Sequence, residues 1–470
     1  MKLVNLLILL MFCSIGARAV DIECQPGMLH TKIEQPGTVS TLSIRGAIDG
    51  SDIYFISSSM PSLRSLDLSK VKIVAYVGKK VGGMSQYPAS TLPAGFFAGS
   101  NIEMVMLPVG CTVGDFAFSC SKLTMVSLPE GTVLQQGAFA KCENLTKVVI
   151  EPSVKLARSA FEDCIALSEV DGTKNINEIP ANAFKECIAL KNFNFSTSLN
   201  SVGADAFAGG GIEMVDMAGC KLSVSIGEWS FADCKNLKSV VLPKKVSRVG
   251  RGAFSACTAL SDITLPENMT SLPDMVLANA SKVDEIAMPS SISDIGHYAM
   301  KSMGSVDSVA LPASLLTIGE GAMEGMESLV AIDATKVAEV PALGGDVWGD
   351  KDKKKVVLIV KQDLKNQFAS TPQWQDFDIR DGSDTGIDLQ EHSSAIRAAF
   401  VGTTLMIESN GADISSVAIY DIAGHLLASA ISSGTTVLAL DTSAVDGSGN
   451  VFIVSCTLDD GVKGTVKLLR

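Results

Sequence analysis

The sequence has few of the residues from which nucleic-acid-binding and catalytic sites are built. It contains 4 His, 3 Trp and 5 Tyr, and its 38 Lys and Arg are outnumbered by 51 Asp and Glu, for a net charge of −13. Phosphate binding needs clustered cations, so this balance argues against a nucleic-acid partner. The one basic run, Lys351 with Lys353–Lys355, is interspersed with aspartates, which predicts a solvated loop.

Catalytic motifs are missing as well. None of His30, His297, His392 and His425 stands in a zinc-protease motif, and the sequence has neither a G-x-S-x-G motif nor a P-loop. Acidic residues on strand faces could pair for glycoside hydrolysis, but no aromatic platform for sugar accompanies them. The segment 381–392 ends on His where a calcium loop needs Glu. We predict a protein that is not an enzyme and that binds no cofactor or metal.

Long apolar runs are confined to the N-terminus, so the sequence predicts no integral membrane span. Lys2 precedes an apolar stretch from Leu3 to Gly16, and Ala17-Arg18-Ala19 fits the small-x-small rule for signal-peptide cleavage. We expect residues 1–19 to be a signal peptide and the exported chain to begin near Val20.

A unit of about 22 residues recurs along more than half of the chain. The clearest copies carry an aromatic residue, Cys three residues later and Leu three further on. Taking that Leu as anchor, the copies are spaced by 21 to 25 residues at Ile102, Leu123, Leu145, Leu167, Leu190, Ile212, Leu237, Leu260, Val283, Val306 and Leu329. A fixed period in this range is typical of a solenoid, in which each unit buries its apolar face against its neighbours.

Each unit combines a short strand with a buried aromatic. After the anchor Leu123, Val126 and Leu128 alternate with Met125 and Ser127, which is the pattern of a strand with one buried face. We expect the aromatics to stack in one column, formed by Phe96, Phe139, Phe161, Phe184, Phe231 and Phe254. The last three copies continue this column with Leu277, Met300 and Met323.

Six cysteines share one repeat position, namely Cys120, Cys142, Cys164, Cys187, Cys234 and Cys257. An exported protein would favour disulfides. Other copies, however, place Gly99, Gly209, Ala280, Met303 and Met326 there, so the position calls for a compact apolar group. We predict a ladder of buried free thiols, with rung-to-rung disulfides or a metal site as alternatives.

The repeat resembles the BspA-like (Treponema-type) leucine-rich repeat of bacterial surface proteins, as in GAFSACTALSDITLP at 252–266. This resemblance covers about residues 90–335 and implies a β-rich solenoid of short strands and turns, with roughly eleven units plus caps. We expect an N-terminal cap and first repeat at 20–90, the solenoid at 91–335 and a C-terminal cap at 336–380. The last would contain a strand, a short helix and the aromatics Trp374 and Phe377.

A linker at 381–394 separates this solenoid from a segment with a different pattern, 395–470. Six short strands between turns predict a small antiparallel β-sandwich there: Leu405–Ser409, Val417–Tyr420, His425–Ser429, Thr436–Leu440, Val451–Cys456 and Thr465–Leu469. The turn from Ile419 to Gly424 and the basic ending Lys467–Arg470 resemble the C-terminal sorting domain of type IX secretion cargo. It departs from that pattern at Gly449-Asn450-Val451-Phe452, where Gly-Val-Tyr is usual.

The outward strand positions form the candidate binding face: Met104, Met106, Met125, Lys147, Glu169, Asp171, Asn192, Asn194, Asp216, Asp262 and Glu285. Exposed Met suits adaptable protein contacts. The resemblance implies an exported, non-catalytic, extracellular or surface-attached adhesion module of Bacteroidetes type, whose partner is a host-matrix or bacterial-surface protein. The alternatives are a ligand-free structural spacer of the cell envelope, or a ligand surface on the cap loops around Gly78–Tyr87.

Overall fold

The computed structural model describes residues 18–381, 396–401, 404–409, 412–420, 426–431, 435–442, 451–459 and 463–469. These residues belong to two compact units, Met1–Leu260 and Ser261–Arg470. Most of the predicted signal peptide lies outside the described residues, and so does the predicted linker, with His392, except for Asp381, which is described as the last residue of a strand. His425 also lies outside the described residues.

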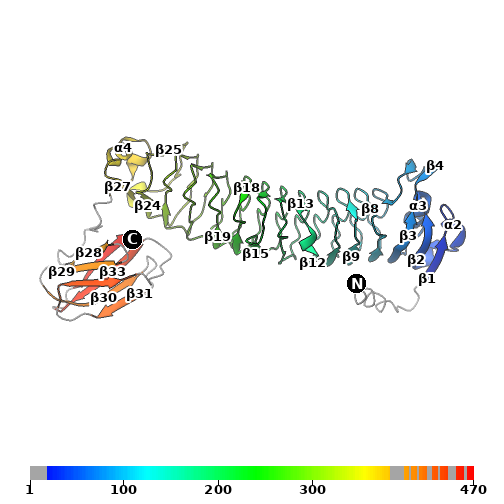
Figure 1. Cartoon of the computed structure of the whole chain (residues 1–470), viewed down its shortest axis with the longest axis horizontal. Coiled ribbons are helices and arrows are strands. Elements are labelled where there is room, and N and C mark those ends of the chain that lie inside the picture. Colours follow the sequence, from blue (N-terminus) through cyan, green and yellow to red (C-terminus); the bar gives the residue numbers. More distant parts are fainter. Residues whose placement is uncertain are drawn as a thin grey trace. The chain divides into compact units, whose positions relative to one another are not determined.

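In the first unit, most coils of the solenoid add a strand to a parallel sheet (Figure 1). The seven-stranded sheet runs in the order β1 (Arg18–Cys24), β2 (Val39–Ile48), β3 (Ser65–Ile73), β7 (Met104–Met106), β9 (Met125–Leu128), β11 (Lys147–Ile150) and β12 (Glu169–Asp171). β15 (Met214–Asp216) pairs with β17 (Ser239–Val241). The predicted alternation is confirmed, since Val126 and Leu128 are buried while Met125 and Ser127 are half-buried.

A second series of shorter parallel strands follows the other side of each coil. It comprises β6 (Thr91–Leu92), β8 (Thr112–Val113) and β10 (Val133–Leu134), then β13 (Glu178–Ile179), β14 (Ser201–Val202), β16 (Val224–Ile226) and β18 (Val246–Val249). A glycine follows several of these strands because consecutive coils approach closely there. A Cβ on Gly250 would lie 2.4 Å from the amide nitrogen of Glu228 in the preceding coil.

Three helical segments and a hairpin complete the N-terminal part, namely α2 (Leu29–Lys32), α3 (Gly50–Ser59), the 3-10 turn Pro36–Thr38 and the strands β4 (Tyr76–Val81) and β5 (Met84–Tyr87). α3 begins at a capping box in which the Asp49 carboxylate accepts from the amides of Ser51 and Asp52. The buried Asp52 carboxylate accepts from the amides of Gly27 and Leu29 at 2.7 and 2.9 Å, which fixes α2 against α3. A 3-10 turn, Thr173–Asn175, follows β12.

The predicted aromatic column is present, with one correction. Eight buried rings stack with centroids 5.0–5.7 Å apart across consecutive coils: Phe97, Phe118, Phe139, Phe161, Phe184, Phe207, Phe231 and Phe254. Phe97, rather than the predicted Phe96, begins the column. Phe96 points the other way and contacts Tyr54 and Tyr87.

The thiol ladder is present in five of the six predicted coils. Cys142, Cys164, Cys187, Cys234 and Cys257 are buried and free, and each Sγ donates to the carbonyl of the column Phe in the preceding coil at 3.1–3.2 Å. The prediction is wrong for Cys120, which is exposed. It occupies a left-handed turn, with φ of 56°, two residues after Phe118. Ser121 takes the ladder position instead, its Oγ 3.3 Å from the Sγ of Cys142.

In two other coils, the ladder position was predicted one residue too early. Gly99 and Gly209 have positive φ and lie two residues after Phe97 and Phe207, so they belong to the same left-handed turn as Cys120. The residue three positions after each column Phe is Ser100 and Gly210. In these coils the ladder position still lies three residues after the column Phe. The missing residue falls between the ladder position and the anchor Ile102 or Ile212.

The second unit begins with β19 (Asp262–Thr264) and contains further parallel coils. One sheet joins β20 (Ser271–Leu272), β21 (Asp294–Ile295), β23 (Thr317–Ile318) and β25 (Ala342–Leu343), and another joins β22 (Ser308–Ala310), β24 (Ala331–Ala334), β26 (Val357–Val360) and β27 (Asp378–Asp381). Leu277, Met300 and Met323 are buried at the column position, as predicted. The basic residues Lys353–Lys355 form one 3-10 turn.

An aromatic cluster closes these coils at their C-terminal end. Trp348 contacts Trp374 and Phe377, with ring centroids 5.3 and 4.9 Å apart. The indole N–H of Trp374 donates to the carbonyl of Pro341 at 3.0 Å. The expected strand, helix and aromatic pair correspond to β26, α4 (Lys365–Ser370) and the 3-10 turn Trp374–Asp376 with Phe377. Such a cap covers the apolar face that an end coil would expose.

The last described segments form antiparallel sheets, as predicted. β28 (Ile396–Val401), β29 (Thr404–Ser409) and β32 (Val437–Asp441) make one sheet, and β31 (Leu426–Ile431), β30 (Ile414–Tyr420), β33 (Val451–Leu458) and β34 (Lys463–Leu469) make the other. Their core includes Leu405, Ile407, Val417, Ile419 and Val454. All six predicted strands are present, and β28 is an additional one.

Candidate functional site

The register of the seven-stranded sheet brings six of the predicted face residues into two adjacent rows. Met104, Met125, Lys147 and Glu169 are direct neighbours across β7, β9, β11 and β12. Met106 and Asp171 lie two residues further along their strands, in the row that also contains Ser127 and Val149. Residues two apart on a strand share a face. The first part of the candidate face is therefore one continuous outward surface.

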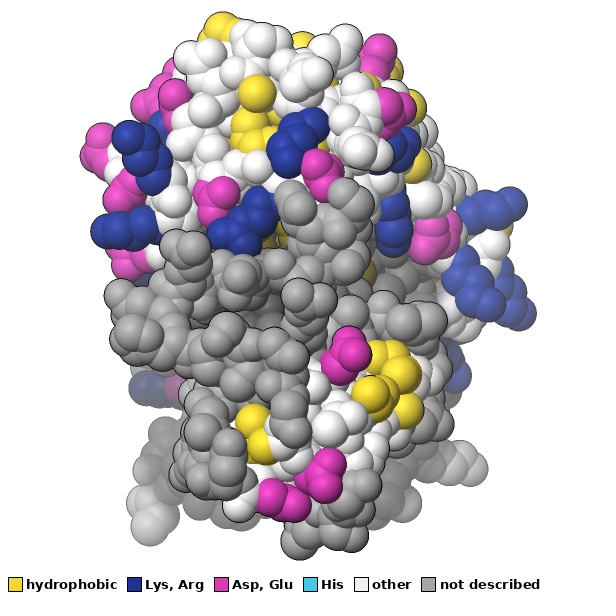
Figure 2. Space-filling model, turned by 90° about the vertical axis from the view of Figure 1, so that its left-hand side faces the viewer, with side chains coloured by type: hydrophobic (Ala, Val, Ile, Leu, Met, Phe, Trp, Pro, Cys, Tyr) yellow, Lys and Arg dark blue, Asp and Glu magenta, His cyan; other side chains and the backbone are white. Residues whose placement is uncertain are grey.

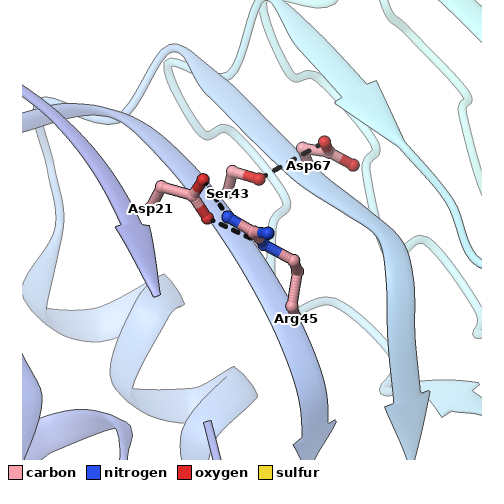
Figure 3. A network of polar contacts seen from close by, with 4 residues as sticks. All are labelled: Asp21, Ser43, Arg45 and Asp67. Carbon is pink, nitrogen blue, oxygen red and sulfur yellow. Dashed lines mark hydrogen bonds and ion pairs between the residues drawn. The ribbon is translucent and has the colours of Figure 1, made fainter. Parts of the chain in front are cut away.

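The same outward surface becomes polar on the first three strands of the sheet, as Figure 3 shows. Arg45 on β2 pairs with the carboxylate of Asp21 on β1, and the Ser43 hydroxyl donates to Asp67 on β3 at 3.4 Å. Arg45 and Asp21 are both more than half exposed, so their ion pair contributes little to stability. These strands present a self-paired polar surface next to the Met residues.

The acidic residues at the end of this sheet are compensated by Lys147. Its Nζ lies 2.5 Å from the Glu169 carboxylate and 2.8 Å from that of Asp171. The hydrogen bonds that its ammonium donates to Asp171 and Glu169 raise the pKa of Lys147. Glu169 and Asp171 therefore do not act as an isolated negative stripe, because a lysine on the neighbouring strand holds both of them.

A hollow of about 280 Å³ lies on the next coils of the first unit, where the strand ladder is interrupted. Residues 191–196 form no strand between β12 and β15. The residues that line this hollow, called here the Asn192 hollow, include Asn192, Asn194, Phe195, Met214, Asp216 and Cys220. Three of these residues belong to the predicted face.

The Asn192 hollow combines an aromatic floor with unengaged polar groups. Phe193 and Phe195 pack against each other and on the column ring of Phe207, with centroids 5.1–6.0 Å apart. Neither the Asn192 nor the Asn194 side chain makes a hydrogen bond to any described residue. This arrangement offers an apolar contact surface with two amides ready to bond a ligand.

Sequence reasoning did not select Met214 or Phe195. Met214 is 53 % exposed at the rim of the Asn192 hollow. A signal for it exists, because Ile-Glu-Met-Val occurs at both 102–105 and 212–215, which gives Met214 the position of Met104. The remaining predicted residues, Asp262 and Glu285, lie in the second unit, where both are exposed.

A larger hollow, of about 620 Å³, lies in the second unit and is lined mainly by charged side chains. Its lining includes Tyr298, Glu320, Glu324, Glu327, Lys351 and Lys355. Many of these groups are already engaged, since the Tyr298 hydroxyl donates to Glu320 at 2.7 Å and the Lys351 ammonium donates to the carbonyl of Glu327 at 2.6 Å. Figure 2 likewise shows basic and acidic side chains interspersed over the described surface in that view. We regard this hollow as structural.

The described residues contain no grouping of three or more His, Cys, Asp or Glu side chains that could hold a metal ion. His297 is exposed, and its Nδ1 accepts from the amide of Glu320 at 3.2 Å. In the same part of the chain, no helix combines the length and the apolarity needed to cross a bilayer.

Comparison with known proteins places this geometry in a family. Residues 88–330 match the BspA type leucine rich repeat region in three overlapping segments, 88–164, 111–224 and 218–330, which together span more than half of the chain. The chain belongs to the BspA-type leucine-rich repeat family. No curated protein matches this BspA-type chain.

Several solved structures are similar to this BspA-type protein. One from Bacteroides ovatus ATCC 8483 is 21 % identical, with a TM-score of 0.57 over 74 % of this chain and 85 % of that chain. A leucine rich cell surface protein from Faecalibacterium prausnitzii A2-165 is 20 % identical, with a TM-score of 0.32 over 67 % of this chain and 82 % of that one. The pneumococcal vaccine antigen PcpA is 16 % identical, with a TM-score of 0.31 over 72 % and 84 %. The first structure supports the fold of this chain. The structural similarity of the other two is too low to bear on it.

Proposed function

We propose that this BspA-type protein is a non-catalytic, extracellular or surface-attached adhesion module that binds proteins through the outward strand face and the Asn192 hollow. The observation that carries the proposal is the hollow itself, in which an aromatic floor, the exposed Met214 and two unengaged amides lie together. The family and the repeat architecture support it.

The hollow suits the anchor side chain of a protein partner. Binding energy in protein interfaces concentrates in a few side chains that fill well-packed pockets. Met adapts its shape to different partners, and the Asn amides can bond a partner's backbone. The row of Met104 and Met125 extends the contact surface, whereas Lys147 is committed to its two carboxylates.

We expect Met214→Asp to weaken binding of a protein ligand at least tenfold, because it places a charge at the rim of the apolar floor. The measurement is biolayer interferometry with the full chain against purified extracellular-matrix and bacterial-surface proteins. Asn192→Ala combined with Asn194→Ala should cost about fivefold through the lost hydrogen bonds.

Ile188→Asp is the matched control, since Ile188 is also 53 % exposed but does not line the hollow. It should leave the affinity unchanged. If Met214→Asp and Ile188→Asp bind an identified ligand equally well, the ligand surface lies elsewhere. If the wild type binds no protein from either source, the alternative of a ligand-free envelope spacer is favoured.

We further propose that the chain is exported and that residues 395–470 direct export or surface attachment, which rests on the signal-peptide pattern and the sorting-like segment. Deleting 395–470 should shift the protein away from its normal compartment while leaving ligand binding intact, because the solenoid has its own aromatic cap. Fractionation of cells followed by immunoblotting measures the shift. An unchanged distribution would contradict a sorting role.

A further inference from the structure

The β4–β5 hairpin is a projecting element that is firmly anchored at its base. Figure 1 shows β4 standing out beside α3. The Tyr87 ring is 4 % exposed and lies 5.5 Å from the ring of Phe96, which also contacts Tyr54 on α3. Gly82 at the turn has φ of 56°, and a Cβ there would lie 2.6 Å from the Phe96 ring. Phe96 therefore supports the hairpin, which explains why it is absent from the column.

The two faces of the hairpin differ in what they contact. Tyr76 and Tyr87 are partners in the register and face the body of the unit. Val77 pairs with Gln86, so Val77 lies on the opposite face, together with Met84, two residues from Gln86. Val77 is 77 % exposed and Met84 is 56 % exposed. The hairpin thus presents an apolar strip to solvent with no intrachain partner among the described residues.

Lysines without ion pairs to described residues lie on this hairpin and on β3, the strand before it. The sequence contains no Asp or Glu between Asp67 and Glu103, although the whole chain carries 51 acidic residues. The same stretch contains Lys70, Lys72, Lys79 and Lys80, all exposed and none in an ion pair with a described residue. A basic, apolar projection on a protein with a net charge of −13 is a local reversal of charge.

Protection of the hairpin edges explains only part of this pattern. Lysines and a bulge on an edge strand discourage pairing with another strand, and β4 has a register shift between Val77 and Val81. Protection of edges does not require Val77 and Met84 to be exposed on the outward face. The bulge and lysines also disfavour an added strand as the ligand.

We propose that the β4–β5 hairpin docks the protein on the surface of an anionic phospholipid bilayer. Val77 and Met84 enter the interface, while Lys79 and Lys80 of the same hairpin lie at the level of the phosphates. Burial of apolar side chains together with attraction of Lys to anionic lipid is the physical basis of peripheral membrane binding. Charge complementarity favours this occupant, because an anionic surface attracts the lysines of the hairpin. The same surface repels the acidic remainder of the chain, so the hairpin is the part that docks.

The test is sedimentation of the full-length protein with vesicles of phosphatidylglycerol and phosphatidylcholine, or of phosphatidylcholine alone. We expect binding only to the anionic vesicles, weakened by added salt. Lys79→Ala with Lys80→Ala should lower the partition coefficient about thirtyfold, from about 1 kcal/mol for each lysine near the surface. Val77→Asp with Met84→Asp should lower it at least tenfold.

Lys244→Ala with Lys245→Ala is the matched control, because these adjacent lysines are also exposed and have no ion pair with a described residue. It should bind vesicles like the wild type, as should Met214→Asp, which separates this inference from the proposed protein-binding function. Thermal unfolding would verify that each variant is folded. Three results would overturn the proposal: no binding of the wild type, equal losses in the hairpin and control variants, or hairpin-dependent binding to polyglutamate without binding to vesicles. The last would identify an acidic protein as the partner.

Discussion

Replacing Phe161 by alanine is expected to lower the free energy of unfolding by about 3–5 kcal/mol, the usual cost of deleting a core aromatic. Its ring is fully buried and lies between those of Phe139 and Phe184, with centroids 5.7 and 5.6 Å away. Neighbouring coils cannot close the gap without breaking their own stacking. Urea denaturation followed by circular dichroism measures the loss.

Phe116→Ala provides the comparison, since Phe116 belongs to the same unit but is 44 % exposed at a left-handed turn. Its loss should cost less than about 1 kcal/mol, as for most surface substitutions. A similarly small loss for Phe161→Ala would show that the column does not carry the stability of the coils.

The second large effect is loss of stability at alkaline pH. Burial raises the pKa of Cys111 and of Cys234 from an ordinary value of 9.0 to about 12, and it also raises the pKa values of Cys187 and Cys257. The unfolded chain therefore loses these protons at a lower pH than the folded chain. The stabilisation is complete below pH 9 and is lost as the pH rises from 9 toward 12, by about 1.4 kcal/mol per pH unit for each thiol.

Urea denaturation at several values between about pH 8 and pH 11 measures this slope. Cys111→Ala and Cys234→Ala each remove one titrating thiol, so each variant should have a shallower slope than the wild type above pH 9 by about 1.4 kcal/mol per pH unit. Other groups that titrate in this range affect all three proteins equally. Equal slopes would mean that these thiols ionise alike in the folded and unfolded chains.

The repeat could be predicted from sequence because burial imposes the same side-chain classes on every coil. The errors fall where a coil is one residue shorter. Adjacent Phe96 and Phe97 both satisfy the pattern, and only the packing of the hairpin on Phe96 shows which ring enters the column. The prediction for Cys120 failed for a related reason. A cysteine is the residue type that the ladder uses, but the backbone of Cys120 is left-handed, which places it in the turn before the ladder position.

The sequence predicts which residues of the candidate face align across strands. It does not predict where that face is hollowed. A period of 22 residues with strict alternation is enough to align Met104, Met125 and Lys147 across strands. The Asn192 hollow depends on residues 191–196 leaving the strand ladder and on the packing of Phe193 and Phe195. These are cooperative packing outcomes that no local pattern encodes.

Hydrogen bonds link consecutive coils in both directions. The amide of Phe161 donates to the carbonyl of Ala183 in the following coil, and the Cys187 thiol of that coil donates back to the carbonyl of Phe161. Other amides donate the opposite way, as that of Gln135 does to the carbonyl of Val113 in the preceding coil. Cutting the array at either end therefore leaves backbone N–H groups without acceptors. Gains and losses of whole repeats are consequently tolerated best inside the array, where each new coil restores both sets of contacts, and both ends must be sealed.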